Sequence, residues 1–481
     1  MFTLKPVSGL PLDDRSGQHR LHCFRQGGQP KGCQQRLGQS GQVLLFALAL
    51  LMVGASGLLL MFDVGQAVNT KSRLVNAADA SAYSAAAWRA RVFNYMAYSN
   101  RAIIAQEVAV AQAVTLDSWS QYFAGFTRNV NGIAAAYPPA AAITQAIASA
   151  AQLAQTTTAA TAATEIRLRD APRVGYKTLL QHSQRVLRTA AGTFGASAVA
   201  NEVARASDSR FFAFALPDND AYQKFARRYE SDADRQRLKT LVTRSMDPFT
   251  GGPRGENQTL VLPASCLLLS PSPSDWFQRY RKRGGTVLAD NGLDRWESAD
   301  TGSLHDSKRR RFSRLCRRTE VMPMGWGAAE VVLEPGVRRL TANPGDIQYN
   351  ARATANDQRD FASNVSASYR GTGIARVFDL NYSALADNRY PSSRVVVLAS
   401  VNADRLKISE KLRVGSGRLA KAGRWAGGKL WALAAAEVYF KRPPLAPAKT
   451  EYASLYNPYW QVRLVAPDGS DAQQAAGYGA Q

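Results

Sequence analysis

The chain has 481 residues and a formal net charge of +23 at pH 7, and 46% of its residues are hydrophobic. That hydrophobic share is ordinary for a globular protein, and the length leaves room for two or three folded units. The charge excludes no class of partner by itself. In a cytosolic protein it would indicate nucleic acid, whereas outside a membrane it equally suits lipid headgroups or cell-wall polymers.

Residues 1–42 are rich in Gln, Gly and Arg and contain few large apolar side chains. Such a segment cannot bury a core, so we expect a disordered cytoplasmic tail. The tail holds His19, His22, Cys23 and Cys33, but this spacing lacks the close cysteine pairs of a zinc site. We expect no metal and no cofactor.

Val43–Phe62 is an apolar stretch without charge or proline, long enough to cross a bilayer as a helix. It is longer than the apolar part of a typical signal peptide, which favours an uncleaved anchor. Lys and Arg are more frequent before the stretch than just after it. This bias predicts a cytoplasmic N-terminus and a body on the opposite side of the membrane, with a single membrane pass because no second stretch is as long and apolar.

Residues 63–135 are rich in alanine and predict a helical stalk. Gln66–Ala124 contains neither Gly nor Pro, but helices of that length are rare in globular proteins, so we expect a break. Apolar residues at seven-residue steps and small residues along one seam suit packing on another helix, and a homo-oligomer through anchor and stalk. The alternative is a composition that simply favours helix. The residues concerned are Val68, Val75, Met96, Ile103 and Val110, and then Ala47, Gly54, Gly57, Ala78, Ala82 and Ala85.

Residues 136–250 predict a second helical region. Pro138-Pro139 ends the first unit, and Ala140–Ala163 is either a weak helix or an Ala/Thr-rich spacer. Two further helices are expected, over Tyr176–Arg205 and Ala221–Met246.

Residues 251–468 contain short apolar runs separated by turn residues, which predicts a β-rich extracytoplasmic domain whose loops carry much of the charge. The fold class is therefore α+β. Residues 469–481 are small and polar and are expected to be a disordered tail. The candidate strands are Thr259–Leu262, Thr286–Leu288, Glu330–Leu333, Arg394–Val401, Lys429–Phe440 and Trp460–Leu464.

Cys266 and Cys316 are the cysteines that follow the apolar stretch. They are a candidate disulfide in an oxidising compartment, and the alternative is a pair of unrelated buried thiols.

Basic and aromatic residues are mixed between Trp276 and Arg318. Such mixing can bind single-stranded nucleic acid or another anionic polymer. The alternative is a solvated charged surface over an aromatic core. The candidate anionic-surface patch consists of Arg281, Lys282, Arg283, Lys308, Arg309, Arg310 and Arg311.

A set of short motifs follows the tail in a fixed order: Arg36, Gly41-Gln42, the apolar stretch, Asp63-Val64-Gly65, Asn76-Ala77-Ala78-Asp79-Ala80 and Ala85-Ala86-Ala87. Together they resemble the N-terminal region of the TadE/TadG-like pilus-assembly proteins of the tight-adherence (Tad, Flp) system. The resemblance implies a bacterial inner-membrane protein that helps to assemble pili, with other pilus or secretion components as partners.

The motif residues also have physical interpretations. Asp63 would end the bilayer stretch at the headgroups, and Gly65 would let a neighbour approach. Asn76 and Asp79 are one turn apart, so they share a helix face and could hydrogen-bond a partner helix, or both could simply be solvated. Prepilins are cut after a glycine and carry a glutamate at the fifth position beyond it. Phe46 occupies that position after Gly41, so we expect the chain to stay anchored.

The sequence contains no HExxH motif, no Walker loop and no Gly-x-Ser-x-Gly elbow, so we expect no enzyme. The resulting hypothesis is a membrane-anchored scaffold that acts by protein–protein association. The alternative is an envelope module that binds an anionic polymer or DNA, and a secreted enzyme ranks third.

Overall fold

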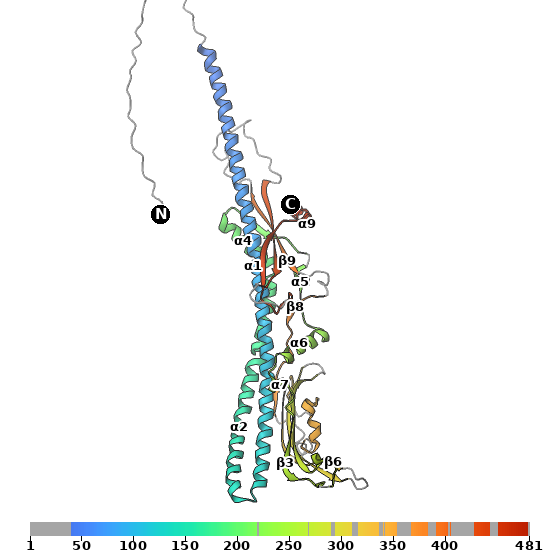
Figure 1. Cartoon of the computed structure of the whole chain (residues 1–481). Coiled ribbons are helices and arrows are strands. Elements are labelled where there is room, and N and C mark those ends of the chain that lie inside the picture. The colour runs from blue at the N-terminus through green and yellow to red at the C-terminus, as the bar shows by residue number, and fades with distance from the viewer. Residues whose placement is uncertain are drawn as a thin grey trace, which may run out of the picture. The chain divides into compact units, whose positions relative to one another are not determined.

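The computed structural model describes residues 40–218, 221–267, 269–289, 294–309, 316–335, 340, 342–353, 367–382, 391–402, 405, 428–442 and 451–479. It confirms the α+β class (Figure 1). The helices are α1 (Ser40–Ala134), α2 (Pro138–Asp170), α3 (Tyr176–Ala190), α4 (Thr193–Ser207), α5 (Ala221–Phe225), α6 (Asp232–Arg244), α7 (Pro248–Gly251) and α9 (Gly469–Gly479), with 3-10 helices η1 (Pro273–Asp275) and η2 (Pro344–Asn350).

The described strands form three sheets. A four-stranded sheet has the order β1-β9-β10-β11, a two-stranded sheet pairs β2 with β8, and a five-stranded sheet has the order β3-β4-β5-β6-β7. Among these pairs only β6 and β7 run parallel. The strands are β1 (Phe212–Ala215), β2 (Ala226–Arg228), β3 (Glu256–Pro263), β4 (Phe277–Leu288), β5 (Trp296–Arg309), β6 (Cys316–Val332), β7 (Ala367–Arg370), β8 (Phe378–Leu380), β9 (Ser392–Asn402), β10 (Lys429–Phe440) and β11 (Trp460–Val465).

Helix α1 is unbroken, so the expected break within Gln66–Ala124 is wrong. Residue contacts divide the chain into two units, Met1–Phe62 and Asp63–Gln481, and α1 contributes to both. Within the second unit α1 is more than a stalk, because both large hydrophobic cores pack on it. At 1.5 Å per residue, its part from Asp63 to Ala134 is about 110 Å long.

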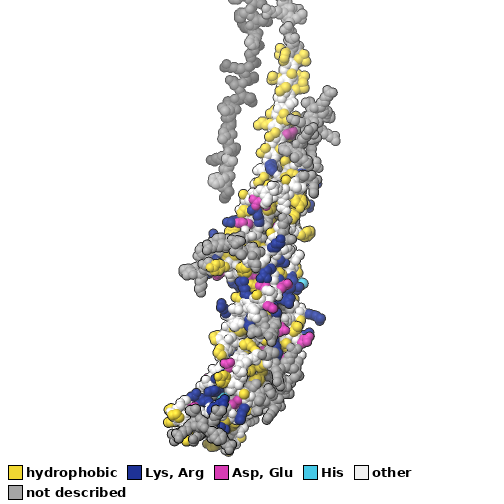
Figure 2. Space-filling model, turned by 90° about the vertical axis from the view of Figure 1, so that its right-hand side faces the viewer, with side chains coloured by type: hydrophobic (Ala, Val, Ile, Leu, Met, Phe, Trp, Pro, Cys, Tyr) yellow, Lys and Arg dark blue, Asp and Glu magenta, His cyan; other side chains and the backbone are white. Residues whose placement is uncertain are grey.

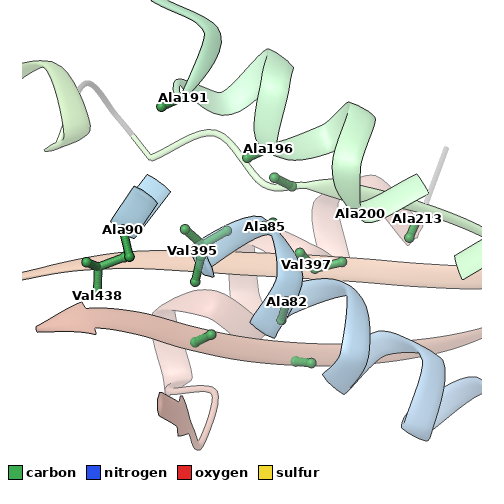
Figure 3. Packing of buried hydrophobic residues seen from close by; sticks show 14 of the residues in the cluster. Ala82, Ala85, Ala90, Ala191, Ala196, Ala200, Ala213, Val395, Val397 and Val438 are labelled. Atoms are coloured by element: carbon green, nitrogen blue, oxygen red, sulfur yellow. The ribbon is translucent and has the colours of Figure 1, made fainter. Parts of the chain in front are cut away.

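The first core lies between α1, α4 and the four-stranded sheet. Ala82 and Ala85 of α1 and Ala200 of α4 are fully buried in it, beside Val397 of β9 (Figure 3). Because alanine has no atoms beyond Cβ, the two helices approach closely, and Ser81 Oγ donates to Ala200 O at 2.9 Å. The second half of the small-residue seam, Ala78, Ala82 and Ala85, is therefore buried inside the body of the same chain.

The second core lies farther along α1 and joins it to the five-stranded sheet. Ile103, Val110 and Val114 of α1 pack with Trp296 of β5 and Val331 of β6. Burial of these apolar side chains stabilises the contact by roughly 25 cal/mol per Å² of apolar surface.

Two glycines of β6 let α1 lie close to the five-stranded sheet. A Cβ on Gly327 would lie 2.0 Å from Ser118 O, and a Cβ on Gly325 would lie 2.7 Å from Tyr122 O. Both distances are far below a normal contact, so any larger residue would push the helix away from the sheet. The lack of a side chain at these two glycines therefore sets the distance between α1 and the five-stranded sheet.

Polar side chains of α1 connect it to segments that are distant in sequence. The Nδ2 of Asn100 donates to Phe378 O and Leu455 O, both at 2.7 Å. Asn94 exchanges two hydrogen bonds with the backbone of Trp460, at 3.0 Å each. These amides complete the hydrogen bonding of backbone groups that would otherwise be buried without partners.

The helical region differs from the prediction in detail. Ala140–Ala163 is helical as part of α2, which resolves the two alternatives. The helix expected over Tyr176–Arg205 is two helices, α3 and α4, separated at Ala191-Gly192. The segment Ala221–Met246 contains α5, β2 and α6 rather than one helix.

Each candidate strand lies within an observed strand or overlaps one, but β4 and β6 are much longer than expected. Strand β5 was not predicted, because its sequence is polar and lacks an apolar alternation. The expected disordered tail is wrong over Gly469–Gly479, which form α9. There Asp471 is buried and contacts Arg394 of β9, so a tertiary contact holds a polar segment in place.

Replacing Ala85 with leucine should lower the free energy of unfolding by about 1–3 kcal/mol, because the added carbons have no room between α1, α4 and the four-stranded sheet. The change can be followed by the fluorescence of buried Trp296 and Trp460 during thermal unfolding of the full chain in detergent.

The matched control is Ala80→Leu, which adds the same carbons at an exposed position of the same helix. We expect that variant to stay within about 0.5 kcal/mol of the parent. Equal losses from both variants would contradict the packing described for this seam.

Candidate functional site

The apolar stretch Val43–Phe62 lies in α1 and is exposed almost throughout. Among the described residues, α1 is the one helix long and apolar enough to cross a membrane. Its most apolar window has a mean hydropathy of 2.6 and no buried share. One long apolar helix near the N-terminus fits a single-pass membrane anchor.

Small residues leave open space along this stretch. Ala47, Gly54 and Gly57 are exposed, and a Cβ built on either glycine meets no atom within 4 Å. Gly65 is likewise open, whereas Asp63 is half-buried. The roles predicted for these residues in helix packing remain predictions.

The seven-residue positions of α1 divide into two groups. Met96, Ile103 and Val110 are buried in the two cores, so this part of the face packs inside the body. Val68 and Val75 are exposed, with 63% and 38% of their surfaces accessible.

Asn76 is exposed and Asp79 half-buried, next to the buried Ala77 and Ala78. Neither polar side chain makes a hydrogen bond or ion pair with another described residue. A hydrogen bond from either residue to a partner helix therefore remains a prediction.

The described basic residues of the predicted patch lie on strands β4 and β5, and not in loops. Arg279, Arg281 and Arg283 alternate along β4 with Tyr280 and Lys282, so the two sets face opposite sides of the sheet. In Figure 2, Lys and Arg side chains are spread along the body and include a group near its lower end, the end that carries the five-stranded sheet in Figure 1.

Lys282 belongs to the interior and not to the predicted surface patch. Its Nζ lies 3.0 Å from Asp300 Oδ1 and 5.1 Å from the centre of the Tyr122 ring of α1, and its side chain is 13% exposed. Asp300 also binds Arg254, with an Oδ2 distance of 2.8 Å, and accepts a hydrogen bond from Ser118. This cluster fastens β4 and β5 to α1.

Two further patch residues lie on β5 rather than in a loop. Lys308 is exposed near the end of β5, and Arg309 is the last residue of that strand. Arg310 and Arg311 lie outside the described residues. Arg279 and Arg318 belong to the same basic clusters of the sequence but were left out of the candidate patch, although the alternation with Arg281 and Arg283 indicates Arg279.

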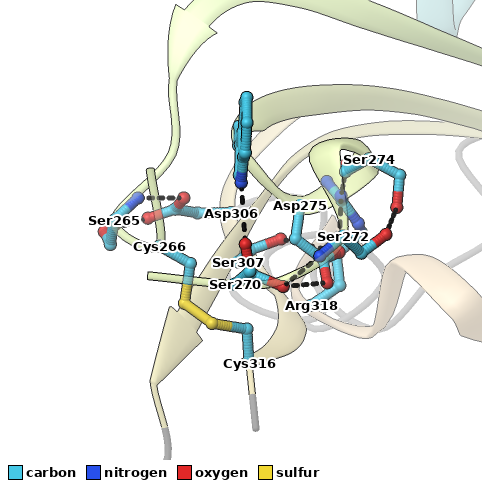
Figure 4. The surroundings of a disulfide bond; sticks show 11 residues. Ser265, Cys266, Ser270, Ser272, Ser274, Asp275, Asp306, Ser307, Cys316 and Arg318 are labelled. Carbon is cyan, nitrogen blue, oxygen red and sulfur yellow. Dashed lines mark hydrogen bonds and ion pairs between the residues drawn. A yellow bond between two sulfur atoms is a disulfide. The ribbon is translucent and has the colours of Figure 1, made fainter. Parts of the chain in front are cut away.

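A disulfide joins Cys266 to Cys316, with Cα atoms 6.4 Å apart (Figure 4). Around it, Ser265 N donates to Asp306 Oδ1 at 2.9 Å, and Arg318 donates to Ser274 O at 2.7 Å. The bridge thereby connects the turn after β3 with the start of β6.

A buried charge cluster, Lys177 with Glu107 and Asp170, joins α1, α2 and α3. Lys177 Nζ lies 3.1 Å from Glu107 Oε1 and also contacts Asp170, and all three side chains are at most 1% exposed. Burial raises the pKa of Glu107 despite the nearby lysine. Burial would lower the pKa of Lys177, but the two carboxylates outweigh it and raise that pKa. No sequence motif pointed to this cluster.

The described residues contain no arrangement typical of catalysis. No group of three or more His, Cys, Asp and Glu side chains among them could hold a metal ion. His305 is buried, its Nε2 lies 2.9 Å from Asn350 Oδ1, and burial lowers its pKa. The Nδ2 of Asn350 in turn donates to Arg281 O at 3.0 Å and to Thr301 Oγ1 at 2.9 Å, so His305 belongs to a hydrogen-bond network that joins η2 to β4 and β5.

Comparison with known proteins gives one match. Residues 41–88 match the family model described as putative Flp pilus-assembly TadE/G-like. The resemblance predicted for the N-terminal region is confirmed, and with the candidate membrane helix it supports a pilus-assembly membrane protein. No curated protein matches the chain, and no solved structure matches it.

Proposed function

We propose that this protein is a single-pass membrane scaffold of a Tad-type pilus or a related envelope apparatus, acting by protein–protein association. The observation that carries the proposal is the family match over residues 41–88. The matched segment covers the apolar stretch and the first part of α1 that packs into the body.

Two exposed helical surfaces support association as the mode of action. On α1, Val68, Asn76 and Tyr83 are exposed. On α2, no charged residue occurs between Pro138 and Thr164, while Ile143 and Leu153 are 64% and 70% exposed. Uncharged exposed surface of this kind is typical of sites that contact another protein.

The proposed orientation has the N-terminus in the cytoplasm and the body in the periplasm. The charge bias around the apolar stretch favours it. The disulfide Cys266–Cys316 suits the same side, since such bonds persist in oxidising compartments.

The test is photo-crosslinking of the full chain in a bacterium with a Tad system. A photoreactive residue at Val68 or Asn76 should give adducts with membrane-bound pilus components or with a second copy, because these positions are exposed within the matched segment. The same residue at Tyr452, 80% exposed but outside that segment, is the control.

Adducts at Tyr452 alone, or a chain released from membranes by alkaline carbonate, would refute the proposal. A reporter enzyme fused to the C-terminus tests orientation separately, and activity only in the cytosol would reverse it.

A further inference from the structure

Three arginines form a row on one side of β4. Arg279, Arg281 and Arg283 occupy alternate positions, about 6.7 Å apart along the strand. The intervening Tyr280 and Lys282 contact Tyr122 of α1, so the row faces away from that helix.

The row is poorly neutralised among the described residues. The side chain of Arg281 makes no hydrogen bond or ion pair there, and the Nε atoms of Arg279 and Arg281 are buried without an acceptor. Arg279 donates one long hydrogen bond, 3.3 Å, to Ser274 O. Arg283 is held more firmly, because it donates to Lys282 O at 2.6 Å and to Asn257 Oδ1 at 3.1 Å. The row therefore holds two desolvated Nε donors, those of Arg279 and Arg281, without an acceptor among the described residues.

Neighbouring charges add repulsion. Burial first, and then the positive charges of Arg283 and Arg279, lower the pKa of Arg281. Arg318 of β6 feels the same repulsion from Arg279 and Arg281, offset in part by Asp275 at 3.3 Å. A cluster of like charges opposes folding, and a bound anion would remove that opposition.

Aromatic rings lie at both ends of the row. Phe277 occupies the next alternate position of β4 and is 36% exposed. Tyr349 of η2 is 56% exposed, and the Arg283 guanidinium lies 5.5 Å from its ring centre. Guanidinium groups that bind phosphates beside exposed rings that stack on bases are the usual combination for single-stranded nucleic acid.

We infer that Arg279, Arg281 and Arg283 bind a linear phosphate polymer, with successive phosphates on successive guanidinium groups. The inference concerns a ligand of the five-stranded sheet and does not depend on the pilus-assembly role.

The test measures binding of the full chain in detergent to a fluorescent oligothymidylate of about 16 nucleotides. Arg281→Gln should weaken binding about tenfold and reduce the slope of log affinity against log salt by about 1. Because the Arg281 side chain has no hydrogen-bond or ion-pair partner among the described residues, the same variant should have a melting temperature equal to that of the parent or above it.

The matched control is Arg317→Gln. Arg317 is exposed on β6 beside Arg318 but faces the opposite side of the sheet, so the variant loses the same charge at a different surface. Its affinity should stay within about twofold of the parent, since a charge of the other face contributes only through the general field.

Two further measurements define the chemical class of the ligand. Inorganic polyphosphate should compete for the row, and Tyr349→Ala should weaken the oligonucleotide but not polyphosphate if bases stack on that ring. If Tyr349→Ala changes the affinity for both polymers equally, bases do not stack on that ring. The arginine row would then bind the phosphates without help from the bases, which still supports the inference.

Several outcomes would overturn it: no binding at about 50 mM salt, equal losses from Arg281→Gln and Arg317→Gln, or a lower melting temperature for Arg281→Gln without polymer. Competition by phosphatidylglycerol vesicles but not by polyphosphate would also overturn it, in favour of lipid headgroups.

Discussion

Replacing Lys177 with methionine should lower the free energy of unfolding by about 3–5 kcal/mol, because it leaves two buried carboxylates without their cation. Lys177 Nζ lies 3.1 Å from Glu107 Oε1, contacts Asp170 and donates to Gly373 O at 2.6 Å. Thermal and urea unfolding of the full chain in detergent would measure the loss.

The loss should depend on pH. Burial raises the folded-state pKa of Glu107 above its unfolded value even with the lysine present, so without the lysine its charged form opposes folding at neutral pH. As the pH falls through that folded-state value Glu107 is protonated, and the deficit of Lys177→Met relative to the parent should shrink. A deficit that grows on acidification would contradict this account.

Two companion variants separate charge from bulk. Lys224→Met makes the same exchange at an exposed position of α5 and should change the free energy of unfolding by less than about 0.5 kcal/mol. The double variant Glu107→Gln with Lys177→Met should be more stable than Lys177→Met alone, because one of the unpaired charges is gone. If Lys177→Met and Lys224→Met behave alike, the cluster does not hold the helices together.

Removing the disulfide by Cys266→Ala with Cys316→Ala should cost about 4 kcal/mol in the chain-entropy model, since the bonded residues are 50 apart in sequence. Alanine suits the fully buried position of Cys266 better than serine, which would bury a hydroxyl. Hydrogen exchange should show the loosening first in β3 and the start of β6, which the bridge connects.

Reductant provides the control for the disulfide prediction. It should lower the melting temperature of the parent to that of the double alanine variant and leave the variant unchanged. A parent that is insensitive to reductant, or a variant that melts with the parent, would show that the bridge does not stabilise the body.

Local sequence carried much information about the helices. The uncharged run Val43–Phe62 and the alanine-rich segment without Gly or Pro predicted α1, because apolar length and helix propensity are properties of neighbouring residues. The expected break failed for a tertiary reason: two cores pack along the helix and hold it continuous.

The strands show what a local sequence pattern can predict and what it cannot. Strand β10 was predicted with its observed bounds, since its run of apolar residues is long and buried positions alternate with half-buried ones along most of it. Strand β5 was missed because Glu297 and Asp300 are buried within it, and their ion pairs with Arg295 and Arg254 make that burial possible. Partners that lie at other positions of the chain cannot be read from the strand alone.

The basic residues show the same limit. Composition indicated a positive patch. The strand alternation and the position of α1 decided that Lys282 enters a buried ion-pair cluster, whereas the Nε of Arg281 is left without a hydrogen-bond acceptor among the described residues. A sequence gives the number of charges, whereas pairing depends on distances between side chains.

By itself the sequence determined the apolar segment, the helix that contains it, the α+β class and the resemblance of residues 41–88 to pilus-assembly proteins. Only the tertiary structure decided which face of α1 is buried and that Glu107, Asp170 and Lys177 meet. The physical reason is range: helix propensity and hydropathy act over a few neighbouring residues, while packing and ion pairing act between groups that folding alone brings into contact.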